Sequence, residues 1–114
     1  MIQNETLDQV LMRLTVKQYQ VLKLLNKYDN YLISVTITNE TTSYGITDSS
    51  LVKYSNEIIK SCDANEIKDL IQKNILRESS INSDTDNTKY YRMVELSATT
   101  YNTFKIVTAG IKLK

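Results

Sequence analysis

The feature that most constrains the fold is a pair of strand-like segments, residues 75–81 and 89–96, that are separated by a polar stretch. The second segment contains TKYYRMVEL, a run rich in residues that favour β-structure. Between the two segments, NSDTDNT consists of residues whose side chains satisfy their own backbone in turns. The pattern predicts a long β-hairpin with a hydrophilic tip.

Helix starts are marked three times by a capping box, in which an N-cap side chain and the side chain three residues later bond reciprocally to backbone N–H groups. The pairs are Thr6 with Gln9, Thr15 with Gln18, and Asp63 with Glu66. Apolar residues recur on one face after each pair, which predicts helices over residues 6–14, 15–28 and 63–74. Ser97 is expected to cap a last helix that ends near residue 108.

The helix predicted over residues 15–28 has a clear division between a buried and a solvent-facing stripe. The buried stripe is expected to comprise Tyr19, Val21, Leu22, Leu25 and Tyr28, and the solvent-facing stripe Lys17, Gln20, Lys23 and Lys27.

The segments between these helices predict one strand and one further helix. Residues 31–38, YLISVTIT, alternate between apolar and hydroxylated side chains, as a half-buried strand does. Residues 39–45 are expected to form a loop, and Asp48 or Thr47 to cap a helix over residues 49–62. Two helices in succession, joined by a short turn at residues 61–63, are typical of a helix-turn-helix.

Length and composition predict one α+β domain over residues 1–114. A chain of 114 residues suits a single hydrophobic core, and its 41% hydrophobic and 24% charged residues are ordinary for a globular protein. No run approaches the ~20 apolar residues of a membrane span, and the N-terminus does not resemble a secretory signal. A cytoplasmic protein without a membrane partner is therefore expected.

The chemistry available to the chain argues against an enzyme, a metal centre or a cofactor. It has no histidine, and Cys62 is its only cysteine, so the usual zinc and iron ligand sets cannot be assembled. The same absence removes the commonest general base and the Ser/His/Asp type of nucleophile. Asp63, Glu66 and Asp69 form a carboxylate cluster, but helix capping accounts for two of the three.

The predicted order of helix, strand, helix, helix and two-stranded hairpin resembles the winged helix-turn-helix superfamily. LTVKQYQVLKLL resembles the first helix of MarR-type regulators, EIKDLIQKNILRE their recognition helix, and VELSATTYNTF the end of their wing. The resemblance divides the domain into an N-terminal helix (1–14), a winged-helix core (15–96) and a C-terminal helix (97–114). The two flanking helices resemble those that many bacterial members use for dimerisation.

A narrower resemblance is to small plasmid-borne winged-helix proteins, such as the relaxosome accessory and partition proteins of low-GC Gram-positive plasmids. Asn, Ile, Lys and Tyr supply 41 of the 114 residues, and their AT-rich codons suit a low-GC bacterium, plasmid or phage.

In a winged helix, the second helix of the pair enters the major groove of DNA and the hairpin reaches the adjacent minor groove or backbone. The resemblance therefore implies a set of DNA-binding residues on these two elements. The set is Asn65, Lys68, Gln72, Lys73, Arg77, Asn82, Ser83, Asn87, Lys89 and Arg92. The same polar residues also fit a merely solvated surface. A net charge of +1 is low for a nucleic-acid-binding domain, so the basic surface must be local.

Two functions follow from the resemblance. The first is a double-stranded DNA-binding homodimer, either an accessory factor at a plasmid or phage origin of transfer or partition site, or a transcriptional regulator. The alternative is a protein–protein interaction module, an antirepressor or assembly adaptor, for which a near-neutral surface is no obstacle.

Overall fold

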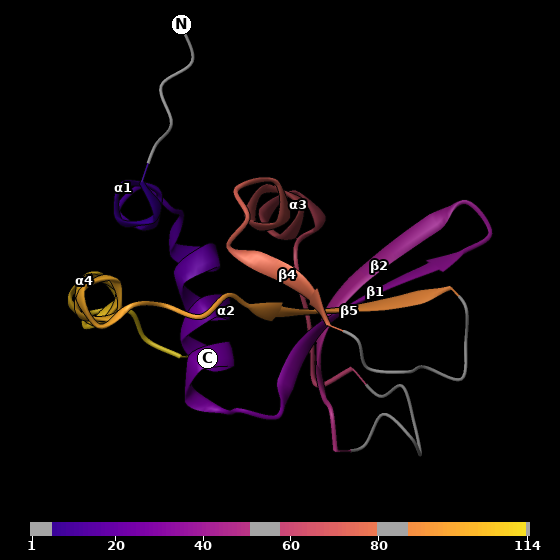
Figure 1. Ribbon diagram of the computed structural model, residues 1–114. Coiled ribbons are helices and arrows are strands. Elements are labelled where there is room, and N and C mark those ends of the chain that lie inside the picture. The colour runs from indigo at the N-terminus through magenta and orange to yellow at the C-terminus, as the bar shows by residue number, and fades with distance from the viewer. Residues whose placement is uncertain (1–5, 51–57, 80–86, 114) are drawn as a thin grey trace, which may run out of the picture.

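The computed structural model describes residues 6–50, 58–79 and 87–113, and in them the chain is an α+β domain (Figure 1). The helices are α1 (Leu7–Leu11), α2 (Val16–Lys27), α3 (Ala64–Gln72) and α4 (Ala98–Thr108). The strands are β1 (Tyr31–Thr38), β2 (Thr41–Asp48), β3 (Lys60–Ser61), β4 (Leu76–Ser79) and β5 (Thr88–Met93). They form one antiparallel sheet in the order β3-β2-β1-β5-β4.

The sheet has one face against the helices and one face away from them. Ile33 and Ile46 lie opposite each other on β1 and β2, and both are fully buried in the core that the helices complete. Because successive residues of a strand point to opposite faces, the neighbouring Leu32 belongs to the other face. There it packs with Tyr90 of β5 in a second, small buried cluster. Tyr91, the next residue, packs against the main core, so the two adjacent tyrosines face opposite ways.

The capping chemistry at the helix starts is largely confirmed. Reciprocal capping boxes begin α1 at Thr6 and α2 at Thr15, and Ser97 caps α4 through the backbone N–H of Thr100. Asp63 caps α3, although its carboxylate accepts from the N–H of Asn65. At the other end of α3, Asn74 adopts a positive φ of 61°, and Ile75 N–H donates to Leu70 O, which turns the chain directly into β4.

The polar stripe predicted on α2 is partly wrong, because two of its residues bind the C-terminal segment. Lys23 Nζ donates to the carbonyl oxygens of Thr108 and Ile111 at 3.0 and 2.7 Å, and Gln20 Nε2 donates to Lys112 O at 3.2 Å. A lysine suits this place because the last carbonyls of a helix carry partial negative charge. On the predicted buried stripe, Tyr28 is instead exposed and stacks on Tyr31, with ring centroids 4.6 Å apart.

The predicted strand over residues 31–38 and the predicted hairpin are both confirmed. β1 has the expected bounds, and β4 pairs with β5 from Leu76–Met93 to Ser79–Tyr90. Most of the predicted tip lies outside the described residues. The loop predicted over residues 39–45 is wrong, because β2 begins at Thr41 and forms a hairpin with β1. Only Asn39 and Glu40 separate the two strands, and Asn39 supplies the positive φ that so tight a turn requires.

The helix predicted over residues 49–62 is wrong wherever the structure describes that span. Thr47 and Asp48 belong to β2, and residues 60–61 form β3, which pairs with β2. Ile59 N–H donates to Ile46 O at 2.8 Å, which extends this edge pairing. The predicted helix-turn-helix corner at residues 61–63 is therefore a turn from strand β3 into helix α3. Residues 51–57 of the predicted helix lie outside the described residues.

Gly45 explains how the chain can pack at this edge of the sheet. A Cβ built on Gly45 would lie 2.5 Å from Cγ2 of Ile58 and 3.1 Å from the backbone oxygen of Lys60. We expect Gly45→Ala to lower the free energy of unfolding by about 1–3 kcal/mol, because β3 must shift to relieve the overlap. Urea unfolding followed by circular dichroism measures this loss. Gly110→Ala is the matched control, since a Cβ there meets no atom within 4 Å; equal losses in both variants would contradict the packing described.

None of the helices in the described residues combines the length and apolar character that crossing a membrane requires.

Candidate nucleic-acid interface

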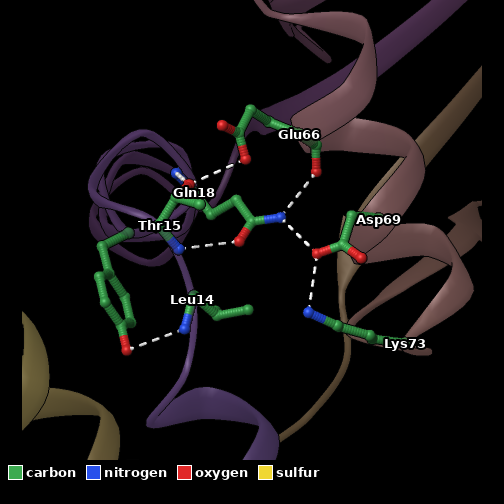
Figure 2. A network of polar contacts seen from close by, with 7 residues as sticks. Leu14, Thr15, Gln18, Glu66, Asp69 and Lys73 are labelled. Atoms are coloured by element: carbon green, nitrogen blue, oxygen red, sulfur yellow. Dashed lines mark hydrogen bonds and ion pairs between the residues drawn. The ribbon is translucent and has the colours of Figure 1, made fainter.

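Helix α3 is held on α2 by a hydrogen-bond network centred on Gln18 (Figure 2). Gln18 is 1% exposed, and each of its polar side-chain atoms is used. Its Oε1 accepts from the N–H of Thr15 at 3.0 Å, while Nε2 donates to Glu66 O at 3.1 Å and to Asp69 Oδ2 at 2.8 Å. One amide thus completes the capping box of α2 and also fixes the rotation of α3 about its axis.

The network engages two of the three carboxylates predicted on α3. Asp69 accepts from Lys73 Nζ at 2.8 Å as well as from Gln18, and these hydrogen bonds, led by that from Lys73, lower the pKa of its carboxyl. Glu66 accepts from Thr15 Oγ1 at 2.8 Å. The capping box predicted for Asp63 and Glu66 is therefore wrong for Glu66, whose side chain turns toward α2. Both carboxylates lie on the α2 side of α3.

The outer side of α3 carries a narrow stripe of amide and cationic side chains, directly beside Asp69, which lies about 40° around the helix from Asn65. Ile67 and Leu70 are fully buried and define the inner side of the helix. At 100° per residue, Asn65, Lys68 and Gln72 fall within 60° of one another on the outer side, and all three are exposed. We call these three residues the α3 stripe. Lys73, also predicted as a DNA-binding residue, is exposed but pairs with Asp69.

The structure divides the cations predicted at the base of the hairpin between the two faces of the sheet. Lys89 and Tyr91 share a face, and Tyr91 packs on the main core, so Lys89 lies on the same side of the sheet as α3. Arg92 lies on the other face, and Arg77 is its direct cross-strand neighbour on β4. The three cations therefore do not share one face of the sheet, and their contact with DNA stays a prediction.

The remaining predicted residues are at the end of the hairpin. Asn87 immediately precedes β5 and is exposed, and its carbonyl accepts from Ile37 N–H at 2.9 Å. Asn82 and Ser83 lie outside the described residues.

Asp63 and Glu78 reduce the positive charge on the α3 side of the sheet. Asp63 is exposed at the start of α3, 3.9 Å from Lys17 Nζ. Glu78 lies opposite Tyr91 and so points to the α3 side of the edge strand. The α3 stripe itself holds no carboxylate.

Cys62 lies just before α3. It is half-buried, and burial raises the pKa of its thiol to about 11. The thiol is therefore protonated at neutral pH, and the protonated form is a poor nucleophile.

Comparison of the chain with models of protein families, with curated proteins and with solved structures finds no match.

Proposed function

We propose that the protein binds double-stranded DNA as a winged-helix variant, with α3 as the helix that enters the major groove. The single observation that carries the proposal is the α3 stripe. Asn and Gln pair with adenine edges, and Lys contacts guanine or phosphate. The carboxylates that would repel phosphate at this helix are mostly engaged with α2.

The arrangement of the sheet also supports the winged-helix interpretation. Strands β1, β5 and β4 are neighbours in that order, α2 precedes β1, and α3 precedes the β4–β5 hairpin. This matches the expected order except at the first helix of the helix-turn-helix, where β2 and β3 occur. Lys89 lies on the α3 side of the hairpin, and in this proposal it neutralises a backbone phosphate.

The proposal includes a two-fold dimer, because one protomer offers few cations. Duplication places two α3 helices on successive major grooves and doubles the contacts. The flanking helices supply apolar side chains for such an interface: Met12, after α1, is 63% exposed and Ile106 of α4 is 76% exposed. We propose that the bound DNA is an origin of transfer, a partition site or a promoter. Binding would take place in the cytoplasm of a cell that carries a plasmid or phage.

Titration of labelled duplexes from the region around the coding sequence tests DNA binding by fluorescence anisotropy. At low salt, Lys68→Ala and Gln72→Ala are each expected to weaken binding roughly tenfold to hundredfold, because each removes a contact worth about 1–3 kcal/mol. Lys89→Ala is expected to reduce the slope of the logarithm of the binding constant against the logarithm of the salt concentration by about one. Light scattering of the complex is expected to give two protomers per duplex.

Arg77→Ala and Arg92→Ala are the matched controls, because they remove the same charge from the opposite face of the sheet. They are expected to leave the affinity within about twofold. Absence of a complex at low salt, or equal losses in all five variants, would refute recognition by α3.

The alternative function is a protein–protein interaction module, which the charge and surface of the chain favour. The net charge is only +1, and Val16 is 60% exposed in addition to the two apolar residues named above. Purification of the protein from its host with one stoichiometric protein partner and no nucleic acid would favour this function over the first.

A further inference from the structure

An open cleft of about 630 Å³ lies where β5 leaves the sheet, beside the C-terminal end of α2. Arg77 and Arg92 line it from the two strands of the hairpin, and Asp29 and Glu95 line it from segments that follow α2 and β5. Tyr31 of β1 and Tyr101 of α4 add two aromatic rings. We call this the arginine cleft. Its volume is within the range of small-ligand sites.

The two arginines are neighbours of like charge in the described part of the sheet. They are direct cross-strand partners, and like charges in that position repel each other. Neither guanidinium has an ion-pair or hydrogen-bond partner among the described residues, and neither Asp29 nor Glu95 pairs with them. Two guanidinium groups on one sheet face present several N–H donors to a single anion. A phosphate oxyanion accepts such forked donors in a bidentate manner.

The other side chains of the cleft suit the body of a nucleoside. Tyr31 is half-buried against the main core and has Tyr28 against its ring, and the exposed Tyr101 has Lys105 Nζ at 5.0 Å from its ring centroid. An aromatic ring can stack on a nucleobase whatever the base, because every base has a π-face. Carboxylates only accept hydrogen bonds, and sugar hydroxyls and base amino groups are donors that Asp29 and Glu95 can bind.

We propose that the arginine cleft binds a nucleoside monophosphate, with Arg77 and Arg92 on its phosphate. The two arginines and two carboxylates of the cleft balance in charge, so additional phosphates find no additional cation there. A monophosphate is therefore bound at least as tightly as a triphosphate. The site lies on the face of the β4–β5 hairpin opposite to Lys89, and it stands whether or not α3 binds DNA.

Isothermal titration calorimetry of the full-length protein with adenosine 5′-monophosphate, adenosine, inorganic phosphate and adenosine 5′-triphosphate tests the site. Saturable binding of one monophosphate per protomer is expected, with adenosine and phosphate each bound at least tenfold more weakly, because each lacks half of the contacts. Arg77→Gln and Arg92→Gln are each expected to weaken monophosphate binding roughly tenfold to hundredfold. Lys89→Gln, which removes a cation from the other face of the sheet, is expected to leave it unchanged.

Both arginine variants are expected to unfold at or above the wild-type temperature, since each removes one of two repelling charges, so lost binding cannot reflect lost folding. No saturable binding of the monophosphate, or binding that both arginine variants retain, would overturn the proposal. Adenosine binding as tight as that of the monophosphate would overturn the role of the arginines. Binding of inorganic phosphate as tight as that of the monophosphate would overturn the proposed role of the tyrosine rings and the carboxylates.

Discussion

Replacing Gln18 by glutamate is expected to lower the free energy of unfolding by about 3 kcal/mol at neutral pH. The Nε2 group of Gln18 donates to Glu66 O and Asp69 Oδ2, and a carboxylate in its place would offer only acceptors to both. The side chain is 1% exposed, so water cannot supply the missing donors. Gln18→Glu therefore places an unpaired buried charge beside the Asp69 carboxylate.

The pH dependence of this loss identifies its cause. Repulsion from Asp69 would raise the pKa of the introduced carboxyl in the folded state above its unfolded value of about 4.3. As pH falls through that raised value, the folded variant takes up a proton and regains one donor. The stability difference from wild type is then expected to shrink toward pH 5, as urea unfolding at a series of pH values would show. Wild-type Asp69 contributes the opposite trend at lower pH, because its own pKa is lowered and its contribution is lost only as pH falls through that lowered value.

Two variants separate this mechanism from a general effect of substitution. Gln18→Leu removes the same hydrogen bonds without adding a charge, so its loss is expected to be smaller and to stay constant until the pH falls far enough to protonate Asp69, whose lowered pKa depends partly on Gln18. Gln72→Glu adds the same charge to the exposed outer side of α3 and is expected to change stability by less than about 0.5 kcal/mol. A Gln18→Glu protein as stable as Gln72→Glu would contradict the network in Figure 2.

The helix starts could be predicted because their chemistry is local. A capping box involves residues three apart, so Thr6 and Thr15 identify the first turns of α1 and α2 from sequence alone. The same rule was wrong for Glu66. Its carboxylate accepts a hydrogen bond from the hydroxyl of Thr15, which is 51 positions away in the sequence. Gln18 also has a partner that the local rule does not predict. Its Oε1 accepts from Thr15 as the capping box requires, but its Nε2 donates to Asp69 of α3. A local pattern cannot predict a partner that only the fold brings near.

The error over residues 49–62 has a different physical origin. Apolar side chains there recur at helical intervals, but Ile58 and Ile59 are β-branched and also suit the edge of a sheet. What favours the strand is the surface that β2 offers: Gly45 leaves the space that Ile58 occupies. β2 itself was missed because only Tyr44 and Ile46 carry its apolar alternation, and they lie among threonine, serine and glycine.

The candidate site was predicted residue by residue, but its division between faces was not. All eight predicted residues that the structure describes are exposed. Because side chains alternate along a strand, the sequence alone puts Arg92 and Tyr91 on opposite faces of the sheet. It does not say which of the two adjacent tyrosines enters the main core. That choice depends on which face of the sheet the helices cover, and it decides that Lys89 and the arginines serve different surfaces.

Truncating Phe104 to alanine is expected to lower the free energy of unfolding by about 3–5 kcal/mol, the usual loss when a fully buried phenylalanine leaves a cavity. Phe104 is 1% exposed in the main core, although it belongs to the C-terminal helix that the sequence places outside the winged-helix core. Lys23 of α2 donates hydrogen bonds to backbone carbonyls at the end of the same helix.

The control is Ile106→Ala, on the same helix but 76% exposed, which is expected to change the stability of the monomer by less than about 0.5 kcal/mol. Denaturant unfolding at a protein concentration low enough to keep both proteins monomeric gives the two values. If α4 were an appendage that frays without disturbing the sheet, both losses would be small and the unfolding transition of residues 15–96 would not move. A loss of several kcal/mol for Phe104→Ala alone, in a single cooperative transition, means that the helix and the sheet that positions α3 unfold together.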